Sequence, residues 1–85
     1  MKFSVNWDPK AEKQLEKLPS PVRRRVILKI RLTGETGRFI ETLKDHEYGH
    51  KIRIGNYRVL VDVFYNPDKI KVRAIGHRKN IYKKV

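Results

Sequence analysis

The sequence contains no cysteine, and acidic residues are scarce: 9 Asp and Glu stand against 21 Lys and Arg. The lack of thiols excludes disulfides, thiolate metal sites and cysteine nucleophiles. No apolar run approaches the roughly 18 residues that a membrane-spanning helix needs. The N-terminus lacks the charged-then-apolar pattern of a secretory signal. We therefore expect a cytoplasmic protein with no membrane partner.

The excess of positive charge is the strongest signal that is present. The net charge is +12 with neutral histidines. A small folded domain with this charge repels itself, so the excess usually serves a polyanionic partner. A merely solvated surface, the alternative, would carry balanced signs. The stretches 17–34 and 69–84 contain several basic residues and no acidic residue. We therefore expect nucleic acid to bind one extended surface or two separate ones.

The order of the elements follows from periodicity and turn signals. Residues 1–85 suit a single small domain. Alternation over residues 3–7 predicts a strand, and Asp8-Pro9 and Ser20-Pro21 each offer an N-cap followed by a proline suited to the first helical turn. The second helix should end between Gly34 and Gly37. Period-two patterns predict three further strands, at 50–54, 57–65 and 70–74, whereas residues 38–45 stay unassigned and the tail from residue 78 should be loosely held.

This order, β-α-α-β-β-β, predicts an α+β fold. A helical hairpin should pack on one face of a small, mainly antiparallel sheet. Gly55-Asn56 is typical of a two-residue hairpin turn, which would place Arg53 opposite Arg58. A turn centred on Pro67-Asp68 would place Arg58 opposite His77. These two registers together predict Arg53, Arg58 and His77 in one row on the sheet face away from the core.

Like charges directly opposite each other destabilise a sheet. An anion between Arg53 and Arg58 would remove that cost, because the planar guanidinium group matches phosphate in a bidentate manner. The alternative is that both side chains extend into water. We favour a phosphate clamp, since a third group that can carry positive charge, His77, would join the two arginines from another strand.

His77 and Tyr82 are the other candidates for chemistry. Imidazole exchanges a proton near neutral pH, as general acid–base catalysis requires; a backbone hydrogen bond at the strand end is an equal alternative for His77. Tyr82, among basic residues, would stack on an RNA base or fold back onto the domain. No metal site is expected, because the remaining histidines, His46 and His50, lack partners at metal spacing and read as surface residues.

Two segments resemble the RelE/ParE toxin superfamily, and its RelE branch in particular. They are Lys-Ile-Arg-Ile-Gly-Asn-Tyr-Arg-Val at 51–59 and Gly-His-Arg-Lys-Asn-Ile-Tyr at 76–82. The resemblance implies a RelE-like fold and the toxin of a type II toxin–antitoxin system. Such a toxin enters the A site of the 30S ribosomal subunit, contacts 16S rRNA and mRNA, and cuts the mRNA through attack of a 2′-hydroxyl on the adjacent phosphate. It also implies a RelB-like antitoxin as partner, and we expect no cofactor.

The resemblance carries roles residue by residue. Lys51, Arg53 and Arg58 would hold the phosphate, Arg78 would act near the leaving group, and Tyr82 would position the nucleotide. The general base stays open between Lys51, His77 and Glu41. The predicted catalytic residues are Lys51, Arg53, Arg58, His77, Arg78 and Tyr82, and the predicted RNA contacts are Lys51, Arg53, Arg58, Lys79 and Lys83.

Two other functions remain possible from the sequence. One is a ParE-like toxin that poisons gyrase and is not an enzyme; it would not need a phosphate clamp with a nearby His and Tyr. The other is an RNA-binding module in which the same clamp holds the backbone without chemistry.

Overall fold

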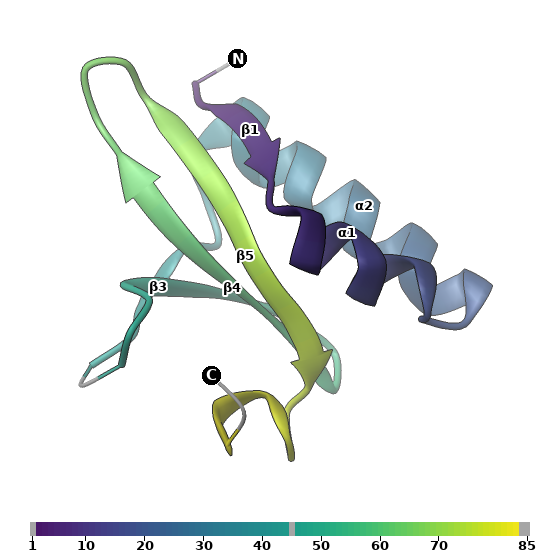
Figure 1. Ribbon diagram of the computed structural model, residues 1–85. Coiled ribbons are helices and arrows are strands. Elements are labelled where there is room, and N and C mark those ends of the chain that lie inside the picture. The colour runs from purple at the N-terminus through teal and green to yellow at the C-terminus, as the bar shows by residue number, and fades with distance from the viewer. Residues whose placement is uncertain (1, 45, 84–85) are drawn as a thin grey trace.

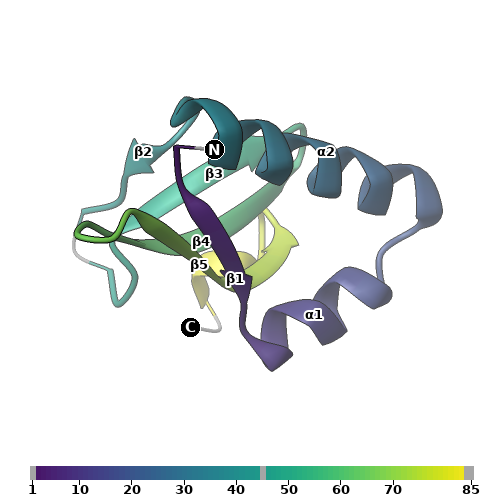
Figure 2. The same cartoon turned by 90° about the horizontal axis from the view of Figure 1, so that it is seen from above.

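The computed structural model describes residues 2–44 and 46–83, except for the side chain of Lys83. Two helices cover one face of a five-stranded sheet of order β1-β5-β4-β3-β2 (Figure 1 and Figure 2). β1 is parallel to β5 and the other pairs are antiparallel, so the predicted α+β fold is confirmed. The elements are β1 (Ser4–Trp7), α1 (Pro9–Glu16), α2 (Ser20–Thr36), β2 (Glu41–Thr42), β3 (His50–Ile54), β4 (Tyr57–Phe64), β5 (Lys69–His77) and the 3-10 turn η1 (Ile81–Lys83).

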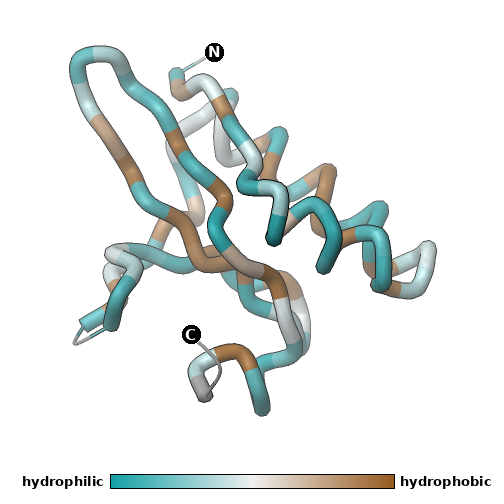
Figure 3. The backbone as a smooth tube through the Cα atoms, viewed as in Figure 1, coloured by the Kyte–Doolittle hydropathy of each residue, from teal (hydrophilic) through white to brown (hydrophobic). Residues whose placement is uncertain are grey.

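The main core lies between the helices and the sheet. Apolar residues recur along β4 and β5 through the middle of the molecule (Figure 3). Val26 and Ile30 of α2 pack against Ile52, Val59 and Val72, all of which are buried. No helix in the described ranges is both long and apolar enough to cross a membrane.

Both helices begin near the predicted positions, but neither uses the predicted cap. The Asp8 side chain makes no hydrogen bond to the first turn of α1. Its carboxylate instead pairs with Arg73 Nε at 2.9 Å and lies 3.5 Å from Lys71 Nζ. A carboxylate bonds more strongly to a cation than to a neutral amide, so the Asp8 carboxylate binds the cations of β5 and does not cap α1. α2 begins at Ser20, with Pro19 in the cap position and no side-chain cap bond.

α2 ends at Thr36, between Gly34 and Gly37 as predicted. The helix runs through Gly34 to Thr36, and Gly37 adopts the left-handed conformation (φ 74°) that commonly ends a helix. Gly34 serves packing, because a Cβ atom there would lie 2.8 Å from Val5 Cγ2. The absence of a side chain lets α2 approach β1.

The connection and the tail hold two elements that the sequence pattern did not predict. β2 is a short edge strand in which Glu41 faces Lys51 across the ladder. The tail is not loose as far as it is described: Ile81 is buried against Leu60 and Ala74 on the sheet face away from the helices. This second, smaller core fixes η1 beside the sheet.

The register of β3 and β4 is as predicted, with Arg53 opposite Arg58. The register of β4 and β5 is not. The β4–β5 loop spans residues 65–68, centred one residue earlier than predicted, and a bulge between Leu60 and Val61 then shifts the ladder by one residue, so Arg58 faces Gly76 and His77 faces Tyr57. Directly opposed residues share a sheet face, and alternation then puts His77 on the helix side and Arg58 on the other side. The predicted row of Arg53, Arg58 and His77 therefore does not form.

Candidate nucleic-acid interface

A basic cavity lies where the β3–β4 turn meets the edge of the sheet. Its volume is about 460 Å³, and four cationic side chains line it with one carboxylate and one aromatic ring. Hereafter we call it the basic cavity. Its lining residues are Lys29, Phe39, Glu41, Arg53, Gly55, Arg58 and Arg78.

The β3–β4 turn holds two of these arginines in place. Gly55, at φ 57°, supplies the positive φ that the tight turn requires. Arg58 Nη1 donates hydrogen bonds of 2.9 Å to the carbonyl oxygens of Gly55 and Tyr57. The backbone N–H of Arg78 donates to the carbonyl oxygen of Asn56 at 2.8 Å. The same turn therefore brings Arg58 and Arg78, which are far apart in the sequence, to one cavity.

Arg53 is held by an acid from the neighbouring edge strand. Its Nε lies 2.8 Å from Glu41 Oε2, and about half of each side chain is exposed. Exposed ion pairs contribute only about 0–1 kcal/mol, so a phosphate group can displace this carboxylate. Glu41 thus belongs to the cavity.

A second group of polar side chains lies on the same sheet face, beside the basic cavity. Lys51 is two residues from Arg53 on β3, which places their Cα atoms about 7 Å apart. Lys51 Nζ lies 5.8 Å from the centre of the Tyr82 ring, and the His46 ring meets the same tyrosine edge-on at 6.0 Å. His46 Nδ1 accepts a hydrogen bond of 3.1 Å from the N–H of Tyr48. We expected His46 to be only a surface residue and did not predict its contact with Tyr82, because its loop has no periodic sequence pattern.

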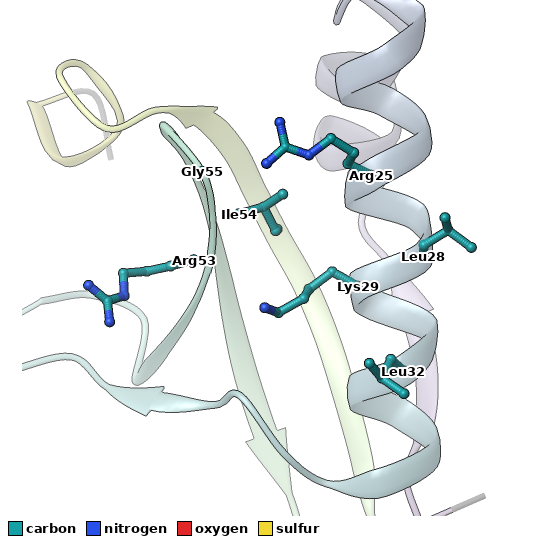
Figure 4. A pocket seen from close by; sticks show the side chains of 7 residues that line it. All are labelled: Arg25, Leu28, Lys29, Leu32, Arg53, Ile54 and Gly55. Carbon is teal, nitrogen blue, oxygen red and sulfur yellow. The ribbon is translucent and has the colours of Figure 1, made fainter.

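α2 adds cations at the edge of the basic cavity. Arg25 and Lys29 leave the helix in the direction of β3, whereas Arg53 leaves β3 on the side away from α2 (Figure 4). Arg25, Lys29 and Arg53 also line an adjoining cavity of about 360 Å³ with Leu28 and Leu32. Neither Arg25 nor Lys29 was a predicted site residue. The clue was the acid-free stretch 17–34, but which of its cations face the sheet depends on how the helix packs.

The structure brings together three of the predicted catalytic residues, Arg53, Arg58 and Arg78, with Lys51 and Tyr82 adjacent to them. It does not bring His77 to them. The His77 ring meets the Tyr57 ring edge-on at 5.4 Å, and its Nδ1 accepts a 3.2 Å hydrogen bond from the backbone N–H of Lys79.

Two predicted features remain outside this arrangement. Lys79 does not line the basic cavity, and the side chain of Lys83 lies outside the described part of the molecule. Within residues 2–44 and 46–83, no three His, Asp or Glu side chains gather in a way that could hold a metal ion.

Comparison with known proteins decides the family. The family model described as the ParE toxin of the type II toxin–antitoxin system parDE matches residues 5–82. The chain belongs to the RelE/ParE toxin superfamily. Within that superfamily, Toxin RelE3 of Methanocaldococcus jannaschii is 33% identical over 76 residues, which are 82% of this chain and 84% of that protein.

Solved RelE structures share the fold. One similar chain is in the RelB–RelE antitoxin–toxin complex from Methanococcus jannaschii. The match has a TM-score of 0.73 and 30% identity, and it covers 93% of this chain and 96% of that chain. The isolated Escherichia coli RelE toxin has a TM-score of 0.75 at 24% identity, with 96% and 93% covered, a likeness of fold alone. The chain is thus a type II toxin of the RelE type, as its resemblance predicted.

Proposed function

We propose that this RelE-type toxin is an endoribonuclease that cuts mRNA in the A site of the 30S ribosomal subunit. The observation that supports the proposal most is the convergence of Lys29, Arg53, Arg58 and Arg78 on one cavity. During phosphoryl transfer, negative charge grows on the phosphate oxygens. Cations fixed in advance stabilise that transition state more than the ground state, and so accelerate the reaction.

The proposed step needs no oxidant, metal or cofactor. The 2′-oxygen of one nucleotide bonds to the adjacent phosphorus while the bond from phosphorus to the 5′-oxygen breaks, which yields a 2′,3′-cyclic phosphate and a free 5′-hydroxyl. The 2′-hydroxyl proton passes to a base and the leaving 5′-oxygen takes up a proton. Arg53 and Arg58 hold the phosphate, Arg78 assists the leaving oxygen, and Lys51 or Glu41 is the base.

The remaining predicted residues bind RNA around this centre. Tyr82 stacks on a base of the strand, and Lys79 and Lys83 contact phosphates outside the cavity. A single-stranded codon among 16S rRNA phosphates matches the net charge of +12. The resting cell must keep this surface covered, so a RelB-like antitoxin is the second partner; RelB–RelE complexes among the similar solved structures support this.

The test compares cleavage on programmed ribosomes with and without the cavity arginines. Arg58→Ala and Arg78→Ala should lower cleavage at least 100-fold, because each removes a cation that stabilises the negative charge of the transition state. Arg23→Ala is the matched control, since that guanidinium bonds to the carbonyl oxygens of Glu16 and Leu18, outside the basic cavity.

Three results would contradict the proposal. Full cleavage by both cavity variants would remove the assigned site. DNA damage without mRNA cuts would favour the gyrase-poisoning function, to which the ParE name of the matched family model also points. Ribosome binding that leaves every mRNA intact would identify a binding module.

A further inference from the structure

Phe39 is the one described aromatic residue of the basic cavity, and its position is unusual in two ways. Its backbone is in the left-handed region at φ 75°, a conformation that residues other than glycine rarely adopt. Phe39 is also 39% exposed, although the next residue, Ile40, packs against the main core. Strained backbone of this kind concentrates at functional sites, where the fold holds a residue in a required direction.

The surroundings of Phe39 are those of a nucleotide-binding surface. The ammonium group of Lys29 lies 4.2 Å from the ring centre and the guanidinium group of Arg38 lies 5.4 Å from it. Among the described residues, Lys29 has no carboxylate within salt-bridge distance. Single-stranded nucleic acids bind surfaces in which aromatic rings receive the bases and neighbouring cations receive the phosphates.

Phe39 and Tyr82 are both partly exposed aromatic residues with a lysine ammonium group near the ring, Lys29 at 4.2 Å and Lys51 at 5.8 Å. Tyr82 lies beside Lys51, and Phe39 shares the basic cavity with Arg53. The two cations are alternate residues of β3, about 7 Å apart on the same face. Tyr82 is thus linked to one of these cations by contact, and Phe39 to the other through the cavity that both line.

We propose that Phe39 is a second base-stacking platform, so that the site holds single-stranded RNA with one base on Tyr82 and a neighbouring base on Phe39. The inference rests on the proposed function and adds a binding subsite to it. On binding, the base takes a face of the phenyl ring and Lys29, on its flexible stem, moves from the ring to a phosphate. Splaying two bases apart also turns the sugar–phosphate link between them toward Arg53 and Arg58.

The experiment measures binding of an RNA trinucleotide that cannot be cut because its 2′-hydroxyls are methylated. It is repeated with the base removed from one terminal position at a time. Phe39→Gly should weaken binding of the intact probe about tenfold, the typical effect of one lost stacking contact. It should not weaken binding of the probe that lacks the base placed on Phe39. Because glycine accepts positive φ without strain, which offsets the packing lost with the ring, this variant should melt within a few degrees of the parent.

Two controls separate this subsite from the rest of the site. Phe64→Ala removes another exposed phenyl ring with a lysine over it, Lys69 at 5.4 Å, far along the β4–β5 hairpin, and should leave binding unchanged.

Arg58→Ala removes a phosphate contact and should weaken every probe equally. If Arg58→Ala has no effect, the proposed phosphate site itself fails; if Arg58→Ala weakens binding but Phe39→Gly does not, only the platform fails. Loss of poly-glutamate binding in Phe39→Gly, with RNA binding intact, would assign the ring to an acidic protein partner and overturn the inference.

Discussion

Replacing Ile81 by Ala tests whether the C-terminal segment is a packed part of the fold that positions Tyr82. Ile81 is 5% exposed and packs with Tyr48, Leu60 and Ala74 on the sheet face away from the helices. It also fits closely over Gly76, where a Cβ atom would lie 2.9 Å from Ile81 Cδ1. The sheet here has a glycine because the isoleucine fills the space.

The magnitude follows from burial and from the size of this cluster. Truncating a buried isoleucine to alanine costs about 2–5 kcal/mol, and least where neighbours can collapse into the cavity. The cluster is small and near the chain end, so we expect a loss of about 2 kcal/mol. Since small proteins have urea m-values of about 1 kcal/mol/M or slightly more, the unfolding midpoint should fall by about 1.5–2 M.

Urea unfolding followed by circular dichroism measures this change, with Tyr82→Ala as the control. Tyr82 is largely outside the cluster and 38% exposed, so its removal should change stability by no more than about 0.5 kcal/mol. RNA binding should weaken in both variants. Ile81→Ala would leave Tyr82 without a fixed position, and Tyr82→Ala removes its ring. An Ile81→Ala midpoint equal to that of the parent would show that the segment does not pack on the sheet and would refute the reasoning.

Three further predictions follow from single contacts. Gly34→Ala should lower the free energy of unfolding by about 1–3 kcal/mol in a denaturant titration, because its Cβ atom would lie 2.8 Å from Val5 Cγ2 and force α2 away from β1. Arg58→Ala should reduce the slope of log affinity against log salt for single-stranded RNA by about 0.7, one phosphate contact, in fluorescence anisotropy; an unchanged slope would mean that Arg58 contacts no phosphate. His77→Ala should lower the melting temperature by a few degrees, through loss of its contact with Tyr57, but leave cleavage on programmed ribosomes within a few-fold of the parent.

Local turn chemistry was enough to predict one half of the site. A two-residue turn at Gly55-Asn56 fixes the register of the strands it joins, and Arg53 lies opposite Arg58 as expected. The other half of the register failed because a bulge after Leu60 shifts the ladder, and no residue type marks that bulge in the sequence. The consequence is largest for His77, which moves to the opposite face.

Residues that reach the site through tertiary packing were not predictable. Lys29 lines the cavity because of how α2 lies against the sheet, and Phe39 because its backbone turns into the left-handed region after the helix. Glu41 was visible only as an uncertain match to a family position, since a two-residue strand carries no periodicity. In contrast, the apolar faces of the longer elements predicted most of the core. The exceptions are Ile27, which is 36% exposed, and Ala74, which was expected beside Ile70 and Val72 but lies in the smaller cluster on the other sheet face.

The central claim is that the cations of this cavity stabilise attack of a 2′-hydroxyl on the neighbouring phosphate. Mapping the ends of mRNA cut on programmed ribosomes tests it most directly, with a second message that carries a 2′-deoxy sugar at the cut nucleotide. We predict 2′,3′-cyclic phosphate and 5′-hydroxyl ends on the natural message and no cut at the deoxy position. Cutting of the deoxy message, or ends that carry a 5′-phosphate, would contradict this mechanism.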